Sequence, residues 1–312
     1  MSNHYFSKQR REIIKSGMGM MAAMATYPQL SMSQANNTSL IKKAIPSTGE
    51  AIPVIGLGTS RTFDVDQPAQ QIKLLPVIEA FFANGGSLVD SSPMYGAAQK
   101  TVGRLLDKLD RPETLFSATK VWIEGKQAGI EQMQKSMDLW GIDSFDLMQI
   151  HNLKDWQIHL ETLREWKSEG KIRYIGITTS HNRFHEELAD IMNKESLDFV
   201  QFTYNIDNRT SEKSLLPIAF DKGIAVLINR PFQRGALFRR VKGKELPAWA
   251  GELGINSWGQ YFLKFAVSHP AVTCAIPATS NVKHMLDNMQ AGYGNVPDLA
   301  SRQKMIKYLQ TI

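Results

Sequence analysis

After residue 40 the chain alternates short apolar runs with longer segments of helical periodicity, and this alternation restricts its fold more than any other feature. Most of the runs are apolar without a break, as is typical of parallel strands buried on both faces. We therefore expect eight strands, at Val54–Gly58, Ser87–Asp90, Leu115–Thr119, Phe145–Ile150, Ile172–Ile177, Phe199–Phe202, Ile224–Ile228 and Val272–Ile276.

Helical patterns separate these runs. The clearest is a stripe of Trp156, Leu160, Leu163 and Trp166 with charged residues opposite. Further helices are expected at 67–84, 98–109, 126–140, 182–193, 211–222, 257–268, 281–291 and 301–312. Eight such strand–helix units in one chain of 312 residues predict an α/β fold, the (β/α)₈ TIM barrel. The segment Ile41–Pro53 carries turn residues in its middle and predicts a β-hairpin before the first barrel strand.

The alternative is a doubly wound sheet with a dinucleotide site after its first strand. Its fingerprint would be the segment Gly56–Arg61, which supplies only half of G-x-G-x-x-G. Arg61 stands where the third glycine belongs, and no helical pattern begins at once. The barrel is therefore preferred.

The first 35 residues differ from the rest of the chain. A basic stretch ends at Lys15, a weakly apolar stretch spans Gly17–Ala25, and small residues that suit cleavage follow, which is the layout of a signal peptide. Arg10 and Arg11, followed by a spacer, two apolar residues and lysine, resemble the twin-arginine (Tat) export motif. A basic amphipathic helix is the competing interpretation. We expect residues 1–35 to be a Tat-type signal peptide, residues 36–312 to be the barrel domain, the Tat export machinery to be a partner, and the protein to be periplasmic.

Composition excludes several other classes. The net charge is +6, but residues 1–35 hold four basic residues and one acidic residue, and no basic run interleaved with aromatics remains beyond them. Nucleic-acid binding is therefore not expected. The single cysteine, Cys274, excludes an internal disulfide. The apolar stretch near the N-terminus is too short for stable membrane insertion, and no metal site is expected.

Polar residues follow three consecutive expected strands. Asp90 ends the second, Lys120 follows the third and His151 the fourth, while Tyr95 lies five residues after Asp90. In a barrel enzyme the chemistry lies at the C-terminal ends of the strands. Each residue has an ordinary structural explanation, such as a turn-capping aspartate or a hydrogen-bonded core histidine. Their occurrence together at one rim favours an active site.

The four side chains suit the reduction of a carbonyl group. Hydride addition to a carbonyl needs a proton donor for the developing alkoxide, and a free phenol with a pKa of about 10 is a poor acid. An ammonium close by lowers that pKa, so Lys120 would tune Tyr95 as the general acid. Asp90 would hold Lys120 charged and oriented, and His151 would orient and polarise the carbonyl oxygen.

Over about residues 40–295 the sequence resembles the aldo/keto reductases. The motifs that carry the resemblance are Gly56–Thr59, Val89–Gly96, Thr119–Trp122 and Leu147–His151, which occur in the family's order with its Asp-to-Tyr spacing of five. The resemblance implies a (β/α)₈ barrel and the reversible reduction of aldehydes and ketones by a nicotinamide cofactor. It assigns the catalytic positions to Asp90, Tyr95, Lys120 and His151.

The resemblance also implies a set of cofactor contacts. Gln201 matches the glutamine that holds the nicotinamide carboxamide, while Asn229 stands where an aromatic residue usually stacks on the nicotinamide ring. Ala278 and His284 replace residues that are often basic, but Lys283 and the start of the last helix favour NADP (NADPH) over NAD, with reduced selectivity. The full expected set is Gly58, Thr59, Thr178, Thr179, Gln201, Arg230, Phe232, Thr279, Ser280, Asn281, Lys283, Asp287 and Asn288.

Three functions remain open at this point. The leading one is an exported NADP-dependent reductase in which Tyr95 is the general acid and a small carbonyl compound is the substrate. The second is an exported, cofactor-bound binding or regulatory module with little turnover, which the Asn229 departure motivates. The third is a barrel lyase or isomerase that uses Tyr95 and Lys120 without hydride transfer.

Overall fold

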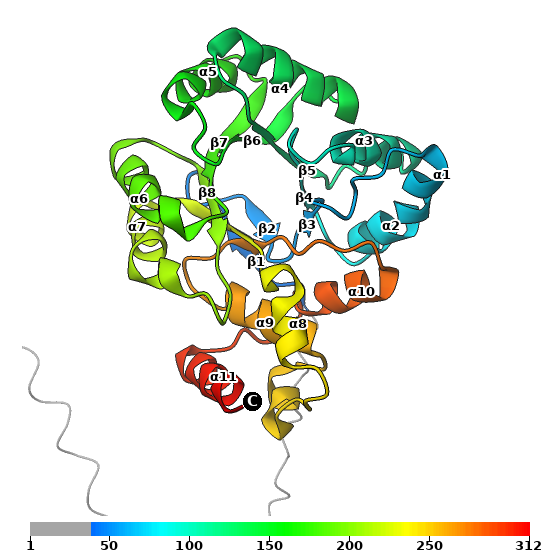
Figure 1. The fold of residues 1–312 in the computed structure, drawn as a ribbon, viewed down its shortest axis with the longest axis vertical. Helices are drawn as coiled ribbons and strands as arrows, with labels where there is room; N and C mark the ends of the chain where they lie inside the picture. Colours follow the sequence, from blue (N-terminus) through cyan, green and yellow to red (C-terminus); the bar gives the residue numbers. More distant parts are fainter. Residues whose placement is uncertain (1–38) are drawn as a thin grey trace, which may run out of the picture. The chain divides into compact units, whose positions relative to one another are not determined.

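Eight parallel strands follow one another in chain order around a barrel in the computed structural model, which describes residues 39–312. The strands lie at the centre and helices surround them (Figure 1). Each strand pairs with the next one along the chain. Their bounds are β3 (Leu57–Gly58), β4 (Leu88–Asp90), β5 (Phe116–Val121), β6 (Phe145–His151), β7 (Ile172–Thr178), β8 (Phe199–Thr203), β9 (Ala225–Asn229) and β10 (Cys274–Ala275).

The barrel closes between β3 and β10. The Gly56 amide donates to the Ala275 carbonyl at 2.9 Å, and the Ala275 amide donates to the Val54 carbonyl at 2.9 Å. A Cβ atom on Gly58 would lie 2.7 Å from the Ile276 carbonyl oxygen, so only glycine permits this approach. The predicted (β/α)₈ barrel is confirmed, and the doubly wound alternative is wrong. The two glycines of the half-fingerprint serve barrel closure.

Helices connect the strands on the outside of the barrel. The helices are α1 (Pro68–Gln71), α2 (Leu75–Ala83), α3 (Ala98–Lys108), α4 (Lys126–Trp140), α5 (Trp156–Ser168), α6 (His185–Lys194), α7 (Leu215–Lys222), α8 (Ala236–Arg240), α9 (Trp258–Val267), α10 (Val282–Gln290) and α11 (Leu299–Thr311). Short 3₁₀ turns occur at Ile72–Leu74, Asn182–Phe184, Thr210–Lys213, Gln233–Gly235 and Ala248–Leu253. Every predicted helix is present, whereas α8 and the turn at 248–253 were not predicted.

The predicted hairpin is present as β1 (Lys42–Ala44) and β2 (Ala51–Pro53), which pair antiparallel. Its apolar side chains Ile45 and Ile52 are buried in one cluster with residues near the start of the barrel strands, such as Phe116 and Phe199. The hairpin therefore packs on the end of the barrel where the strands begin. That end is apolar and filled, which leaves the opposite end for chemistry.

Side chains alternate between the barrel interior and the helix layer. Along β6, for example, Leu147 belongs to the interior cluster, while Met148 and Ile150 belong to the core shared with the helices. The interior positions change from apolar to polar toward the strand ends, where Gln149 and His151 follow Leu147 at intervals of two. Among residues 39–312, no helix combines the length and the apolarity that crossing a membrane requires.

Candidate active site

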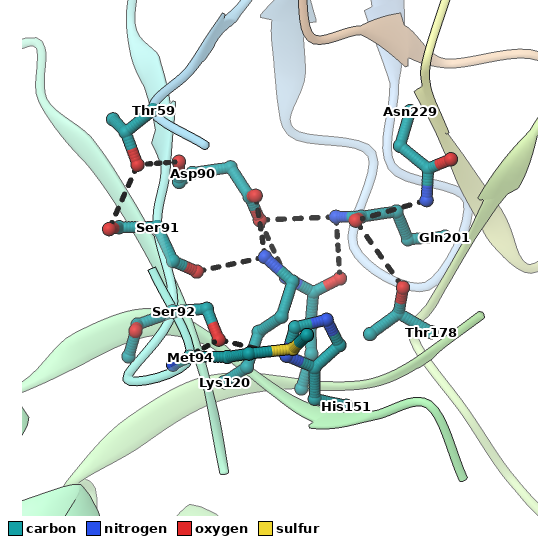
Figure 2. A network of polar contacts seen from close by, with 12 residues as sticks. Thr59, Asp90, Ser91, Ser92, Met94, Lys120, His151, Thr178, Gln201 and Asn229 are labelled. Carbon is teal, nitrogen blue, oxygen red and sulfur yellow. Dashed lines mark hydrogen bonds and ion pairs between the residues drawn. The ribbon is translucent and has the colours of Figure 1, made fainter. Parts of the chain in front are cut away.

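A buried polar layer joins four strands near the C-terminal end of the barrel (Figure 2). The Lys120 ammonium donates to Asp90 Oδ2 at 2.5 Å and to the Ser91 carbonyl at 2.8 Å. The other carboxylate oxygen, Asp90 Oδ1, accepts from Gln149 Nε2 at 2.9 Å and from Gln201 Nε2 at 3.1 Å. The predicted pairing of Asp90 with Lys120 is thus present in the structure.

This ion pair lies out of contact with solvent, since the Lys120 and Asp90 side chains are 0% and 2% exposed. Burying two charges is costly unless each keeps its hydrogen bonds. Here both Asp90 oxygens have partners, and the two glutamines supply neutral donors. Gly176 on β7 makes room for this layer, because a Cβ there would lie 2.8 Å from Gln149 Cγ.

The loop after β4 places the Tyr95 ring next to this layer. The Lys120 Nζ atom lies 5.2 Å from the centre of the Tyr95 ring, and the ring meets the His151 ring edge-on at 5.7 Å between centres. Gly96 makes the turn possible. It has a φ of 57°, and a Cβ on it would collide with the Asp64 carboxylate. The Tyr-Gly pair of the sequence motif therefore has a local structural reason.

The environment of Tyr95 corrects one expectation. Burial raises the pKa of the Tyr95 phenol above its ordinary value, and the Lys120 ammonium, the largest opposing influence, lowers it. The Asp90 carboxylate adds to the rise, and the Arg230 guanidinium opposes it. The lowering by Lys120 that the sequence predicts is present, but desolvation outweighs the cations and the net shift is upward. Tyr95 consequently keeps its proton at neutral pH.

His151 is held by a hydroxyl that the sequence reasoning did not single out. Its Nδ1 atom lies 2.8 Å from Ser92 Oγ, and Ser92 Oγ also accepts from the Met94 amide at 3.2 Å. Burial and the Lys120 charge lower the pKa of His151 to about 2. The imidazole is therefore neutral at any ordinary working pH, so it can act through a hydrogen bond and not as a cation.

Two adjoining cavities open beside these residues. The larger, of about 380 Å³, is lined by Asp90, Tyr95 and Gln201 and extends to Pro277 and Ala278, just before α10. The smaller, of about 250 Å³, is lined by Tyr95 and Gln201 as well as by His151. Tyr95 thus faces both cavities.

The expected cofactor residues fall into two groups. Five of them line the larger cavity, namely Gly58, Thr59, Gln201, Arg230 and Phe232. The others line neither cavity: Thr178, Thr179, Thr279, Ser280, Asn281, Lys283, Asp287 and Asn288.

Most residues of the second group have structural contacts of their own. Thr178 Oγ1 donates to Gln201 Oε1 at 3.3 Å. Asn281 caps α10 by accepting from the Lys283 and His284 amides. Asp287 accepts from Ser257 and Gln260 of the neighbouring α9 region. The α10 end is therefore built as a capped helix N-terminus that continues from the wall of the larger cavity.

Four residues at the site were missed by the sequence reasoning, namely Gln149, Ser92, Arg61 and Arg234. Gln149 had a readable signal, because it lies two residues before His151 on the same strand and therefore on the same face. Ser92 and the two arginines come from loops, whose course the sequence did not indicate. The predicted features of residues 1–35 lie outside the described residues.

Comparison with known proteins places these features in one family. The sequence profile described as "Aldo/keto reductase family" matches residues 54–298. The "NADH-specific methylglyoxal reductase" of Escherichia coli is 28% identical over 228 residues, which cover 63% of this chain and 66% of that protein. The "L-galactose dehydrogenase" of Arabidopsis thaliana is 27% identical over 216 residues, which cover 64% of this chain and 68% of that protein.

Solved structures share the fold. An aldo/keto reductase from Klebsiella pneumoniae, crystallised with NADP and acetate, matches with a TM-score of 0.70 and 24% identity over 83% of this chain and 92% of its own. The holo form of a Bacillus halodurans aldo-keto reductase matches with a TM-score of 0.72 and 21% identity over 87% of this chain and 96% of its own. With the barrel, the buried Asp90–Lys120 pair and a profile match over most of the chain, the protein belongs to the aldo/keto reductase family.

Proposed function

We propose that the protein reduces an aldehyde or ketone to an alcohol with hydride from NADPH, and that Tyr95 is the general acid. The observation that carries this proposal is the position of the protonated Tyr95 between the buried Lys120 ammonium and the neutral His151, at the junction of two cavities. Loss of reduced cofactor on mixing the protein with NADPH and a simple aldehyde tests the activity.

The residues present fit a nicotinamide dinucleotide. The larger cavity begins at Tyr95 and Gln201 and ends beside the N-terminus of α10, where backbone amides and the helix dipole favour phosphate. Arg230 on its wall adds positive charge. NADPH bound there would supply the hydride. The 28%-identical relative is named as NADH-specific, whereas the 24%-identical structure holds NADP. The preference for NADPH proposed for this chain therefore rests on its own residues.

The proton inventory of the site supports the roles of its residues. Tyr95 holds a proton at neutral pH and can donate it to the developing alkoxide. Lys120 stabilises the resulting phenolate. Ser92 Oγ accepts from the Met94 amide, and we infer that it donates its own proton to His151 Nδ1. In that tautomer Nε2 carries the hydrogen that can orient the substrate oxygen.

Gln201 is already fully hydrogen-bonded within the protein. Its amide donates to Asp90 and to Gln149 Oε1 at 3.1 Å, and its oxygen accepts from Thr178 and from Asn229 Nδ2 at 3.4 Å. Asn229, which stands in place of the stacking aromatic residue, therefore fixes Gln201 in place. We infer that a nicotinamide carboxamide replaces the longest of these bonds, the one from Asn229.

Lys283→Glu is expected to weaken NADPH binding by at least about tenfold more than NADH binding. Only NADPH carries the ribose phosphate, and Lys283, exposed in the first turn of α10, is the cation that we propose to bind it. Calorimetric titration of both nucleotides measures the effect. Lys307→Glu, an equal charge change at an exposed position of α11, is the control. Equal losses for the two nucleotides would remove Lys283 from the phosphate site.

Replacement of Arg10 and Arg11 by lysine is expected to leave folded protein in the cytoplasm. We propose that residues 1–35 direct Tat export to the periplasm, and the substitution keeps the charge while removing the paired guanidinium groups. Cell fractionation followed by immunoblotting measures delivery, with Arg239→Lys outside the signal as the control. Undiminished periplasmic protein would contradict Tat export.

A further inference from the structure

Three arginines surround the mouth of the catalytic cavities. Arg61 lies in the loop after β3, Arg230 directly follows β9, and Arg234 lies in the 3₁₀ turn at 233–235. All three line both the larger cavity and the smaller one that contains His151. We call Arg61, Arg230 and Arg234 the arginine cluster.

Within residues 39–312, the three arginine side chains of the cluster form no ion pair with a carboxylate and donate no hydrogen bond. Five of the nine other arginines of residues 39–312 pair with a carboxylate, namely Arg111, Arg164, Arg173, Arg240 and Arg302.

The two acids on the cavity walls are already engaged. Asp90 is paired with Lys120. Asp64 accepts a hydrogen bond from the Ala97 amide at 2.9 Å. The charge that faces the cavities is therefore predominantly positive and is not cancelled by the protein.

The charges of the cluster act on Arg230 and on a neighbouring histidine. The pKa of Arg230 is lowered, first by burial and then by the charge of Arg234, with a smaller effect from Arg61. The pKa of His181, on the wall of the smaller cavity, is also lowered, first by burial and then by Arg230 and two other guanidinium groups. The guanidinium groups thus lower one another's pKa, and an anion bound between them would offset this effect.

The backbone at the cluster is strained as well. Arg61, Arg230 and Arg234 have φ values of 65°, 51° and 53°, in the left-handed region that residues with a Cβ rarely adopt. Such strain persists only where the surrounding structure enforces it, and it gathers at ligand sites. All three arginines thus have strained backbone conformations, and all three line the same two cavities.

We propose that the arginine cluster binds an anionic group, a carboxylate or phosphate, on the substrate, so that the substrate class is an aldehyde or ketone that carries negative charge. This inference rests on the proposed reductase function. Guanidinium groups match such oxyanions with paired hydrogen bonds. The cofactor pyrophosphate is the other source of the same chemistry. All three arginines also line the larger cavity, where Arg230 can serve the cofactor. The substrate is favoured for the cluster as a whole because all three reach the smaller cavity, which holds His151 and which Pro277 and Ala278 near α10 do not line.

The test uses 4-carboxybenzaldehyde and its methyl ester, which share the ring and the aldehyde and differ in the charge of the para group. The ester is the more electrophilic aldehyde, so a preference for the carboxylate cannot arise from reactivity. The native protein is expected to show a kcat/KM for the carboxylate at least about tenfold above that for the ester. Arg61→Gln is expected to reduce this ratio about tenfold, and Arg239→Gln, at an exposed position of α8 outside both cavities, is expected to leave it unchanged.

Two results would overturn the inference. One is a native ratio near one. The other is an Arg61→Gln variant that keeps the native ratio but has a higher KM for NADPH with both substrates. That result would assign the cluster to the cofactor. Calorimetric titration of benzoate into protein saturated with NADP⁺ separates this inference from the proposed function. Benzoate binding that Arg61→Gln abolishes supports the anion site even if neither aldehyde is reduced, and its absence in the native protein contradicts the site.

Discussion

Tyr95→Phe is expected to lower kcat for carbonyl reduction by about 10²–10⁴-fold, the usual contribution of a general acid. The substitution removes the phenolic proton but keeps the ring and its edge-on contact with His151. Affinity for NADPH should therefore change by less than about threefold, because no cofactor contact depends on that proton.

Steady-state kinetics together with calorimetric titration of NADPH measure both quantities. Tyr308→Phe is a matched control, since it removes a hydroxyl that bonds the Glu245 carbonyl away from the cavities. Reduction at a near-native rate by the Tyr95 variant would contradict its role as the acid. Loss of NADPH binding with unchanged turnover at saturation would make Tyr95 a cofactor contact instead.

Lys120→Met is expected to impair both catalysis and stability. Without the ammonium, the pKa of Tyr95 rises further above its already raised value, and phenolate formation becomes unfavourable. Turnover should fall by about 10²-fold or more. The Asp90 carboxylate is left buried without its counterion, which typically costs about 3–5 kcal/mol of unfolding free energy.

The double variant Asp90→Asn/Lys120→Met separates the two effects. It removes the unpaired charge, so most of the unfolding free energy should return while activity stays low. The pH profile gives a second readout. Deprotonation of Tyr95 limits reduction at high pH, and raising its pKa shifts that alkaline limb to higher pH in Lys120→Met. An unshifted limb, or activity restored along with stability, would show that Lys120 acts only as a structural partner of Asp90.

The strands were predictable because they are buried on both faces, so most appear as nearly continuous apolar runs. The first and last strands are shorter than predicted, since β3 and β10 meet through isolated bridges at the closure point. Helix α8 spans only Ala236–Arg240 and buries little, which leaves no periodicity to detect. The barrel itself followed from counting strands and did not depend on any one boundary.

The catalytic rim was predictable for a similar reason. Asp90 and His151 end their strands and Lys120 is the last residue but one of the strand between them, and parallel strands bring their ends to one edge. Gln149 lies inside β6, and a polar residue among apolar neighbours in a strand does not by itself indicate a functional role. The sequence predicted the effect of Lys120 on the pKa of Tyr95 but not the larger effect of burial, which the sequence does not measure.

The arginine cluster could not be predicted from the sequence. Arg61, Arg230 and Arg234 come from loops after the first and seventh barrel strands, far apart in the chain, and each has a left-handed backbone conformation. In the sequence, Arg61 was noted only because it replaces the third glycine of the dinucleotide fingerprint, and Arg230 was predicted only as a cofactor contact. Their common orientation toward the catalytic cavities is a property of the folded loops.

Transfer of deuterium tests the central claim most directly. The purified protein is mixed with 4-carboxybenzaldehyde and NADPH that is deuterated at the transferable position of the nicotinamide, and the alcohol is analysed by mass spectrometry and NMR. The proposal predicts one deuterium on the former carbonyl carbon for each NADPH oxidised by the native protein, and about 10²–10⁴-fold slower formation of the same deuterated alcohol by Tyr95→Phe. Alcohol formed without deuterium, or a native protein that binds NADPH but oxidises none across charged and neutral aldehydes, would contradict it.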